Sequence, residues 1–389
     1  MSPAQQGFFK MNPEFDVIVV GAGIHGLAAA YNLSFHPQLN VAILEQHRIG
    51  HPFGGSHGAS RIFRSTYSHP AYIDLMKRLC LQDWPELERQ TQTQLLYSNP
   101  GCFFGSGRTF ERYLQTLSQS DLDKDILTAK EAKGLFPQFR FHDAAAVVHD
   151  RTAAVIDAGQ TIQKLLRRCT EKSIPLLENT KLISIDTNST NLRLITNTGD
   201  LFAKKLILTT GAWASPWLPI TPIRQTVAYF KLEGPPNSIG NFPCWLYIGE
   251  GENGIFYGLP EFGYEGIKIA RHVTTGPADD PDQHPSPDQT QVKILEKFVQ
   301  AQFVPKIERL VSTETCFYAN LPDEGFIVDL FPNDKRIAIA SVCSGHGFKF
   351  APLIGKLLAE LVLNGVTTVS EFEKWRDFFS IKGSSINYT

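Results

Sequence analysis

The chain has 389 residues, of which 42% are hydrophobic and 20% charged, and its formal net charge at pH 7 is −2. This composition is typical of a globular protein that is too long for one ordinary hydrophobic core, so we expect two domains. The near-neutral charge and the lack of a Lys/Arg-rich run argue against nucleic acid as a partner. No stretch approaches the ~20 apolar residues of a membrane-spanning helix, so no membrane partner is expected.

The six cysteines are scattered along the chain and form no C-x-x-C pair. This pattern argues against a zinc site or another metal site. The N-terminal residues lack the apolar core of a signal peptide. We therefore expect a cytoplasmic protein with unpaired thiols.

The clearest local signal is the segment FDVIVVGAGIHGLAAAYNL, which predicts a buried strand, a tight turn and a helix. Gly21 permits the turn, Gly23 lets the backbone approach a pyrophosphate, and Gly26 lets the helix pack closely on the strand. The next strand, NVAILEQ, ends at Glu45, where a ribose hydroxyl needs an acceptor. This order of elements predicts a dinucleotide site, with these candidate residues: Gly21, Gly23, Ile24, His25, Gly26, Glu45 and Gln46.

A Gly-rich basic segment, GGSHGASRIFR, follows and contains His57, Ser60, Arg61 and Arg64. It can wrap a cofactor and present cations to an anionic substrate, or it can be a solvated surface loop. Its spacing alone leaves both interpretations open, and the motif before it suits FAD and NAD equally.

Further along the chain, apolar spacing predicts a helix over residues 70–91, a strand pair over 95–107 and a helix that starts near Asp157. Alternating residues then predict a β-meander and a buried strand that ends at Gly211, another candidate cofactor contact. Residues 222–311 are strand-like and aromatic, and they include a polar Pro/Asp loop over 276–289 that we expect to be an exposed connector. The last part predicts a strand, a Gly-rich turn and a helix.

These ordered motifs resemble those of the monomeric sarcosine oxidase family of FAD-dependent amine oxidases, and they are most like its L-pipecolate oxidase members. The motifs are GAGIHG with ILEQ, SHGASRIFR, GIKIARH, ETCFYANLPDEGFIVD and CSGHGFKFAP, and the likeness covers nearly the whole chain. It implies an α/β (α+β) monomer with a Rossmann-like FAD-binding domain and a second, mixed β-sheet substrate domain. The expected segments are 1–85, 150–220 and 325–389 for the first domain, and 86–149 and 221–324 for the second.

The resemblance also implies roles around the flavin. It assigns to Cys316 a covalent thioether link to the FAD 8α-methyl group, whereas the residue alone reads as an ordinary core thiol. His57, Ser60 and Arg61 are expected beside the flavin. The turn and helix start formed by Gly345, Gly347, Phe348 and Lys349 are expected at the flavin edge that gains negative charge on reduction.

For the substrate, the resemblance implies that Arg64 and Lys349 bind a carboxylate. It places Lys268 near flavin N5, where a cation assists the reaction of oxygen, and His272 near the substrate amine. Tyr257 and Tyr318 are expected to line the pocket. The alternatives are a surface ion pair for Arg64, an exposed lysine for Lys349, an edge lysine that reaches solvent for Lys268, and aromatic core for the two tyrosines.

The implied activity is oxidation of a small secondary or N-methyl amino acid of the sarcosine, L-pipecolate or L-proline type. Hydride passes to flavin N5, an imine forms, and dioxygen reoxidises the flavin to give hydrogen peroxide. The alternatives are an imine or cyclic-amine desaturase of a biosynthetic pathway, an NAD-dependent dehydrogenase, and a non-catalytic FAD-binding protein.

Overall fold

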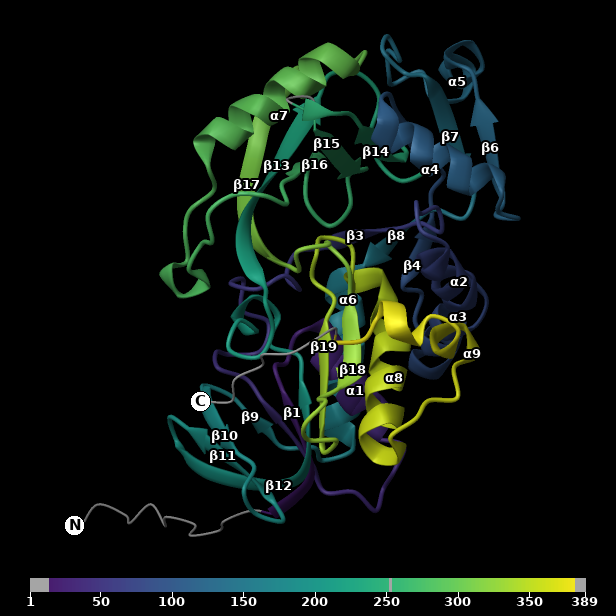
Figure 1. Cartoon of the computed structure of the whole chain (residues 1–389). Coiled ribbons are helices and arrows are strands. Elements are labelled where there is room, and N and C mark those ends of the chain that lie inside the picture. The colour runs from purple at the N-terminus through teal and green to yellow at the C-terminus, as the bar shows by residue number, and fades with distance from the viewer. Residues whose placement is uncertain (1–13, 252–253, 382–389) are drawn as a thin grey trace, which may run out of the picture.

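The computed structural model describes residues 14–251 and 254–381. In this part of the chain the strands form two large sheets of eight strands each and a small three-stranded sheet. Figure 1 shows the small sheet (β3, β8 and β4) between the two large ones.

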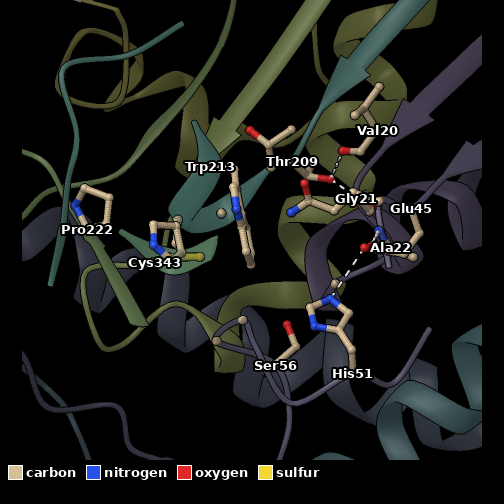
Figure 2. Close-up of a pocket in the computed structure, with 18 of the residues that line it drawn as sticks. Val20, Gly21, Ala22, Glu45, His51, Ser56, Thr209, Trp213, Pro222 and Cys343 are labelled. Carbon is tan, nitrogen blue, oxygen red and sulfur yellow. Dashed lines mark hydrogen bonds and ion pairs between the residues drawn. The ribbon is translucent and has the colours of Figure 1, made fainter. Parts of the chain in front are cut away.

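The first sheet is built around β1 (Glu14–Val20), which lies parallel to and between β12 (Gly199–Leu208) and β2 (Val41–Leu44). Its apolar run from Val17 to Val20 is buried, as expected for a central parallel strand that is covered on both faces. Thr209, just after β12, donates a hydrogen bond from Oγ1 to the Val20 carbonyl at 2.9 Å (Figure 2). The carboxyl ends of β1 and β12 are therefore fixed side by side.

The other strands of this sheet extend the central three. Parallel partners are β9 (Leu176–Leu177) beside β2 and β19 (Ile337–Ser341) beside β12. Antiparallel partners are β18 (Ile327–Leu330) on β19, and β10 (Leu182–Asp186) and β11 (Leu192–Thr196), which continue from β12. The predicted meander is thus confirmed.

Helix α1 (Ile24–Leu33) starts directly after the glycine turn and packs on α8 (Ala351–Asn364). The contact is backbone to backbone, because a Cβ on Gly355 would lie only 2.4 Å from the carbonyl carbon of Ala28. This close approach fixes the N-terminus of α1 at the edge of the sheet. On the neighbouring helix α6 (Ala158–Glu171), Asp157 caps the N-terminus by accepting from Gln160 N–H at 2.8 Å, as the sequence predicted.

The second sheet has the order β17-β13-β16-β15-β14-β5-β7-β6. Helix α7 (Gln289–Gln302) packs against it, and Phe298 stacks on Phe256 with ring centroids 4.0 Å apart. The bounds are β5 (Gly101–Gly105), β6 (Lys124–Leu127), β7 (Ala146–Asp150), β13 (Thr221–Leu232), β14 (Cys244–Ile248), β15 (Ile255–Leu259), β16 (Ile267–His272) and β17 (Ile307–Asn320).

The small sheet joins β3 (Ser60–Phe63), β8 (Ala154–Asp157) and β4 (Leu96–Ser98). The predicted strand pair over 95–107 is present as β4 and β5, but the two strands enter different sheets. The predicted helix over 70–91 is present as α2 (Pro70–Arg78), a π-helical turn (Leu79–Asp83) and α3 (Trp84–Thr91). The remaining α-helices are α4 (Arg108–Ser118), α5 (Ala129–Leu135) and α9 (Ser370–Glu373).

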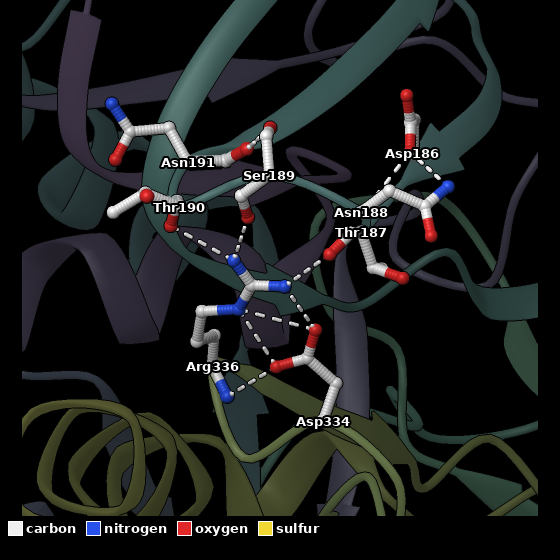
Figure 3. Close-up of polar contacts among 8 residues, drawn as sticks. All are labelled: Asp186, Thr187, Asn188, Ser189, Thr190, Asn191, Asp334 and Arg336. Carbon is white, nitrogen blue, oxygen red and sulfur yellow. Dashed lines mark hydrogen bonds and ion pairs between the residues drawn. The ribbon is translucent and has the colours of Figure 1, made fainter.

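Arg336, just before β19, ties the β10–β11 turn to the sheet (Figure 3). Its guanidinium donates to the carbonyls of Thr187, Ser189 and Thr190 at 2.8, 2.7 and 2.8 Å, and to Asp334 at 2.6 Å. A fork of five donors suits several carbonyls at once, which a lysine cannot match.

Replacing Arg336 with alanine is expected to lower the free energy of unfolding by ~1–3 kcal/mol, because three turn carbonyls lose a charged donor. The measurement is a urea titration followed by circular dichroism. Arg193→Ala is the matched control on β11, because Arg193 only pairs with Asp200 at the exposed surface and should change stability by less than ~0.5 kcal/mol. Equal losses in the two variants would show that the turn contacts of Arg336 contribute nothing specific.

Candidate active site

Two adjoining cavities lie between the sheets. The first has a volume of about 680 Å³ and lies at the carboxyl ends of β1, β2 and β12. The second, of about 260 Å³, is lined by residues of β3, β13, β15, β16 and β17 and of the turn before α8. Both share the following lining residues: Ile24, His25, Gly55, Ser56, His57 and Cys343. A long ligand can therefore occupy both at once.

The glycine turn shapes the inner end of the first cavity (Figure 2). Gly21 has a φ of +96°, and a Cβ there would lie 2.5 Å from the Thr209 carbonyl oxygen. A Cβ on Gly26 would lie 1.8 Å from the Gly21 carbonyl oxygen, so only glycine lets the helix start this close to the strand. The N-terminus of α1, with its partial positive charge, consequently faces the cavity.

Glu45, at the end of β2, is a buried carboxylate on the wall of the first cavity. It accepts the backbone N–H of Ala22 and of His47, each at 2.9 Å, and lies 3.5 Å from His51 Nε2. Burial opposes its charge, but the bonds from His51, His47 and Ala22 hold the pKa of Glu45 below its usual value. An ionised acceptor therefore stands where the sequence placed it.

The rim of the first cavity includes part of the polar loop that the sequence predicted to be only an exposed connector. Ala278 to Asp282 line it together with Trp213, whose Nε1–H donates to Asp282 Oδ1 at 2.6 Å. The loop around this segment is exposed over most of its length, as expected, but Pro281 is buried. The composition of the loop does not indicate this contact, because the contact depends on Trp213, which lies in the short 3-10 helix after β12.

In the second cavity, Lys268 of β16 is buried, with 6% of its surface exposed. Its Nζ donates to the Ser60 carbonyl at 3.1 Å. Arg61, Glu314 and Lys268 converge on Gly58, where a Cβ would lie 3.5, 3.6 and 3.8 Å from their charged atoms. Burial and, next, the Arg61 charge lower the pKa of Lys268 to about 7. Lys268 is thus not an edge lysine that extends to solvent.

Lys349 is also buried, with 5% of its surface exposed. Its Nζ donates to Tyr67 Oη at 3.2 Å and to the His346 carbonyl at 2.9 Å. The Arg64 guanidinium lies over the Tyr67 ring, 4.0 Å from its centroid, and donates to the Thr66 carbonyl. Burial, followed by the charges of Arg64 and Arg61, holds the pKa of Lys349 well below its usual value. Tyr67 therefore joins the two cations.

Cys316 of β17 lines the same cavity. Burial raises the pKa of its thiol, while Arg61 and Lys268 oppose that change. His57 donates from Nδ1 to the Gly54 carbonyl at 3.0 Å, and burial with the Arg61 and Lys268 charges lowers its pKa to about 4. His57 is therefore a neutral imidazole at neutral pH.

The structure places nearly every predicted site residue on one of the two walls. Gly21, Gly23, Glu45, Gln46 and Gly211 line the first cavity, Ile24, His25 and His57 line both, and Gly26 lies beneath the turn. The second cavity takes the others: Ser60, Arg61, Arg64, Tyr257, Lys268, His272, Cys316, Tyr318, Gly345, Gly347, Phe348 and Lys349.

Sequence reasoning missed Tyr67, Glu314 and His346, which also line the second cavity. His346 could have been predicted from the sequence, because it lies in the SGHGFK motif. Tyr67 and Glu314 carried no signal of their own. Within residues 14–251 and 254–381, no group of three His, Cys, Asp or Glu side chains could hold a metal ion. Among the helices of the same residues, none is both long and apolar enough to cross a membrane.

The chain belongs to the family of FAD dependent oxidoreductases (DAO), whose model matches residues 16–361. It is similar to the peroxisomal sarcosine oxidase of Mus musculus, at 33% identity over 364 residues, covering 89% of this chain and 92% of that protein. It is also similar to the monomeric sarcosine oxidase of Arthrobacter sp. (strain TE1826), at 29% identity, covering 92% of this chain and 95% of that protein.

Solved structures share the fold. The open form of NikD, described as an unusual amino acid oxidase, has a TM-score of 0.80 at 21% identity, covering 92% of this chain and 96% of that one. Glycine oxidase from Geobacillus kaustophilus has a TM-score of 0.78 at 18% identity, covering 96% of this chain and 100% of that one. The predicted family and the predicted two-domain α/β fold are therefore confirmed, whereas the segment boundaries of the domains stay a prediction.

Proposed function

We propose that this chain oxidises a small secondary or N-methyl amino acid of the sarcosine, L-pipecolate or L-proline type, with oxygen as the final acceptor. The observation that carries the proposal is a pair of cations in the second cavity, the partly buried Arg64 and the buried Lys349, which are joined through Tyr67. Among the residues that the structure describes, their hydrogen-bond partners are the Thr66 carbonyl for Arg64 and the Tyr67 hydroxyl and His346 carbonyl for Lys349, and no carboxylate pairs with either. Buried charge is costly unless it is paired, so the cavity is suited to a ligand that brings its own carboxylate.

The residues present fit FAD. A Cβ on Gly23 would lie 3.1 Å from Ser56 Oγ, so a side chain there would fill the space between the helix start and the adjoining loop. The residues of the first cavity would hold the nucleotide half, with Glu45 at the ribose, and those of the second would surround the flavin. When bound, FAD supplies the hydride acceptor and the route of the electrons to oxygen.

We further propose that Cys316 holds the flavin covalently. Its position in the second cavity, with the positive charges of Arg61 and Lys268 acting on the thiol, supports this link. Cations favour the thiolate, which is the nucleophilic form of cysteine. The pKa of Cys316 is nevertheless raised by burial, so the two cations offset only part of the cost of forming the thiolate.

The rest of the second cavity suits the remainder of such a substrate. His272, Tyr257 and Tyr318 offer polar atoms for an amine, and Leu246, Ile248 and Ile255 offer an apolar wall for its carbons. Arg64 and Lys349 would orient the carboxylate, so that the amine and its carbon are held in one position. Lys268, on the wall shared with Arg61, would act as the cation that assists oxygen.

We also propose that the protein acts as a monomer in the cytoplasm. The printed name of the Arthrobacter relative supports a monomer. The Mus musculus relative is described as peroxisomal, so the location rests on the expectation from the sequence.

The proposed reaction is tested by offering sarcosine, L-pipecolate and L-proline beside dimethylamine, piperidine and pyrrolidine, with peroxide detection. We expect peroxide from at least one amino acid, and a loss of ~2–5 kcal/mol in transition-state stabilisation in Arg64→Ala and Lys349→Ala for amino acids only. Equal losses on the amines without a carboxylate would contradict the carboxylate role. Oxidation of a cyclic imine but of none of the saturated amino acids would favour the desaturase instead.

The covalent link is tested by acid precipitation of the purified protein. FAD is expected to stay with the pellet in the wild type and to appear in the supernatant in Cys316→Ser. Cys102→Ser is the matched control, because Cys102 is a buried core thiol of β5. Freely extractable flavin in the wild type would contradict the link without affecting the oxidase proposal.

The oxygen role of Lys268 is tested by following the two half-reactions separately in stopped flow. Lys268→Met should raise the activation barrier for reoxidation of the reduced enzyme by air by ~3–4 kcal/mol. The rate of anaerobic reduction by substrate should stay largely unchanged. Because the pKa of Lys268 is lowered to about 7, the cation is present below that pH and lost above it. Wild-type reoxidation should therefore slow as the pH rises through 7, and the variant should show no such step.

A further inference from the structure

A row of polar side chains leads from the second cavity to solvent. Tyr257 Oη of β15 lies 3.1 Å from Tyr318 Oη of β17, and Tyr318 Oη lies 3.3 Å from His272 Nδ1 of β16. The other nitrogen, His272 Nε2, lies 3.6 Å from Glu324 Oε2. The two tyrosines and the histidine line the cavity, whereas Glu324 does not.

Glu324 forms the outer end of this row. It lies in the turn between β17 and β18, and its side chain is 46% exposed, against 18% for His272. The close contact with His272 is the largest influence on Glu324, and it holds the pKa of this carboxyl below its usual value although burial opposes it. An ionised carboxylate in contact with water thus stands behind an imidazole that faces the cavity.

We propose that Tyr318, His272 and Glu324 carry the ammonium proton of the bound substrate from the cavity to solvent. The inference rests on the proposed function, because an amino acid binds mainly as its ammonium form and must be a neutral amine before hydride can leave its carbon. It adds a role for Glu324 and a direction for the proton.

The transfer balances without a co-reactant. The ammonium N–H bond breaks and the nitrogen keeps the electron pair, while the proton passes to Tyr318 Oη. Tyr318 gives its own hydroxyl proton to His272 Nδ1, which leaves an imidazolium facing Glu324. The Nε2 proton then passes to the Glu324 carboxylate and from there to water, so no electron is gained or lost.

The charges around His272 set the direction of this transfer. The titratable groups that face it are Tyr318, Glu324 and, on the turn before α8, His346. Tyr257 joins through Tyr318. Burial, with the charges of Lys349, Arg64 and His272, holds the pKa of His346 well below its usual value, so His346 is a poor acceptor. Lys349 must itself be protonated to bind the carboxylate, which leaves the side of Glu324 as the favourable exit.

The test is Glu324→Gln, compared with Asp323→Asn, which removes a charge from the same exposed turn. Asp323 accepts from Gly325 N–H at 2.9 Å, a bond that asparagine can keep. The rate of anaerobic flavin reduction is measured by stopped flow across pH with the best amino acid of the panel. Affinity for propanoate, which has no amine to deprotonate, reports whether the carboxylate site is intact.

Glu324→Gln should reduce the flavin about five-fold more slowly at neutral pH, the scale of a half-exposed ion pair. The deficit should vanish at alkaline pH, where the amine binds already neutral, and Asp323→Asn should match the wild type throughout. Propanoate affinity should be unchanged in both variants.

A Glu324→Gln enzyme that equals the wild type at every pH, or that is slowed equally at every pH, overturns the path. Slowing of Asp323→Asn to the same extent overturns it too, because the effect would then be one of net charge. These outcomes leave the oxidase proposal standing, since they require a wild type that the amino acid reduces. A wild type that no amino acid of the panel reduces overturns the proposed function and the path together.

Discussion

Positive charge that gathers in the second cavity with few carboxylate partners is the constraint on which this site depends. Arg61, Arg64, Lys268 and Lys349 all line the second cavity, and Glu314 is the carboxylate found beside them among the described residues. Burial of Lys268 and Lys349, with partial burial of the two arginines, would make such a cluster unfavourable, because the cations lose water. The fold tolerates it by giving the cations carbonyls and a tyrosine ring: Arg61 donates to the carbonyls of Ser60, Gly55 and His57, and Tyr67 serves Arg64 and Lys349. These neutral partners satisfy hydrogen bonds but leave the charge for a ligand to compensate.

The scaffold explains how cations from distant parts of the sequence meet. Lys268 comes from the second large sheet, Arg61 from the small sheet and Lys349 from the turn that starts the helical segment after β19. The backbone contact of Gly355 with Ala28 locks that segment against α1, and the tight glycine turn locks α1 against β1. The same close packing therefore fixes the helix start that faces the first cavity and the position of Lys349. Rigid elements hold the polar groups in place before any ligand arrives, which lowers the cost of binding.

Local patterns in the sequence were enough to predict the elements that line the two cavities, because a strand, a glycine turn and a helix each require particular residue types at neighbouring positions. These patterns correctly predicted the positions of Gly21, Gly26, Glu45 and Asp157 in their elements. Judged from its own position, Lys349 was predicted to be an exposed lysine in the first turn of a helix. Only the ordered motifs predicted that it lies in the site. Its burial depends on Tyr67, which is remote in sequence, so no local pattern could predict it.

Other misses have the same cause. The strands β4 and β5 were correctly predicted as neighbours in sequence, but their separation into two sheets depends on pairing with β8 and β14. The contact of Asp282 with Trp213 and the place of Glu324 behind His272 are likewise tertiary. Sequence patterns report what a residue contributes to its own element, whereas a site depends on how several elements meet.

The claim that a ligand carboxylate stabilises the charged form of Lys349 is tested most directly by counting protons when a simple carboxylate binds. Propanoate is titrated into the FAD-loaded protein at about pH 8 by calorimetry, in two buffers that differ in ionisation enthalpy. Since burial holds the pKa of Lys349 low and a bound carboxylate restores its charge, binding should take up as much as about one proton per site. Lys349→Met should bind without proton uptake. Release of protons when propanoate binds to the wild type, or the same proton uptake in Lys349→Met as in the wild type, would contradict the account.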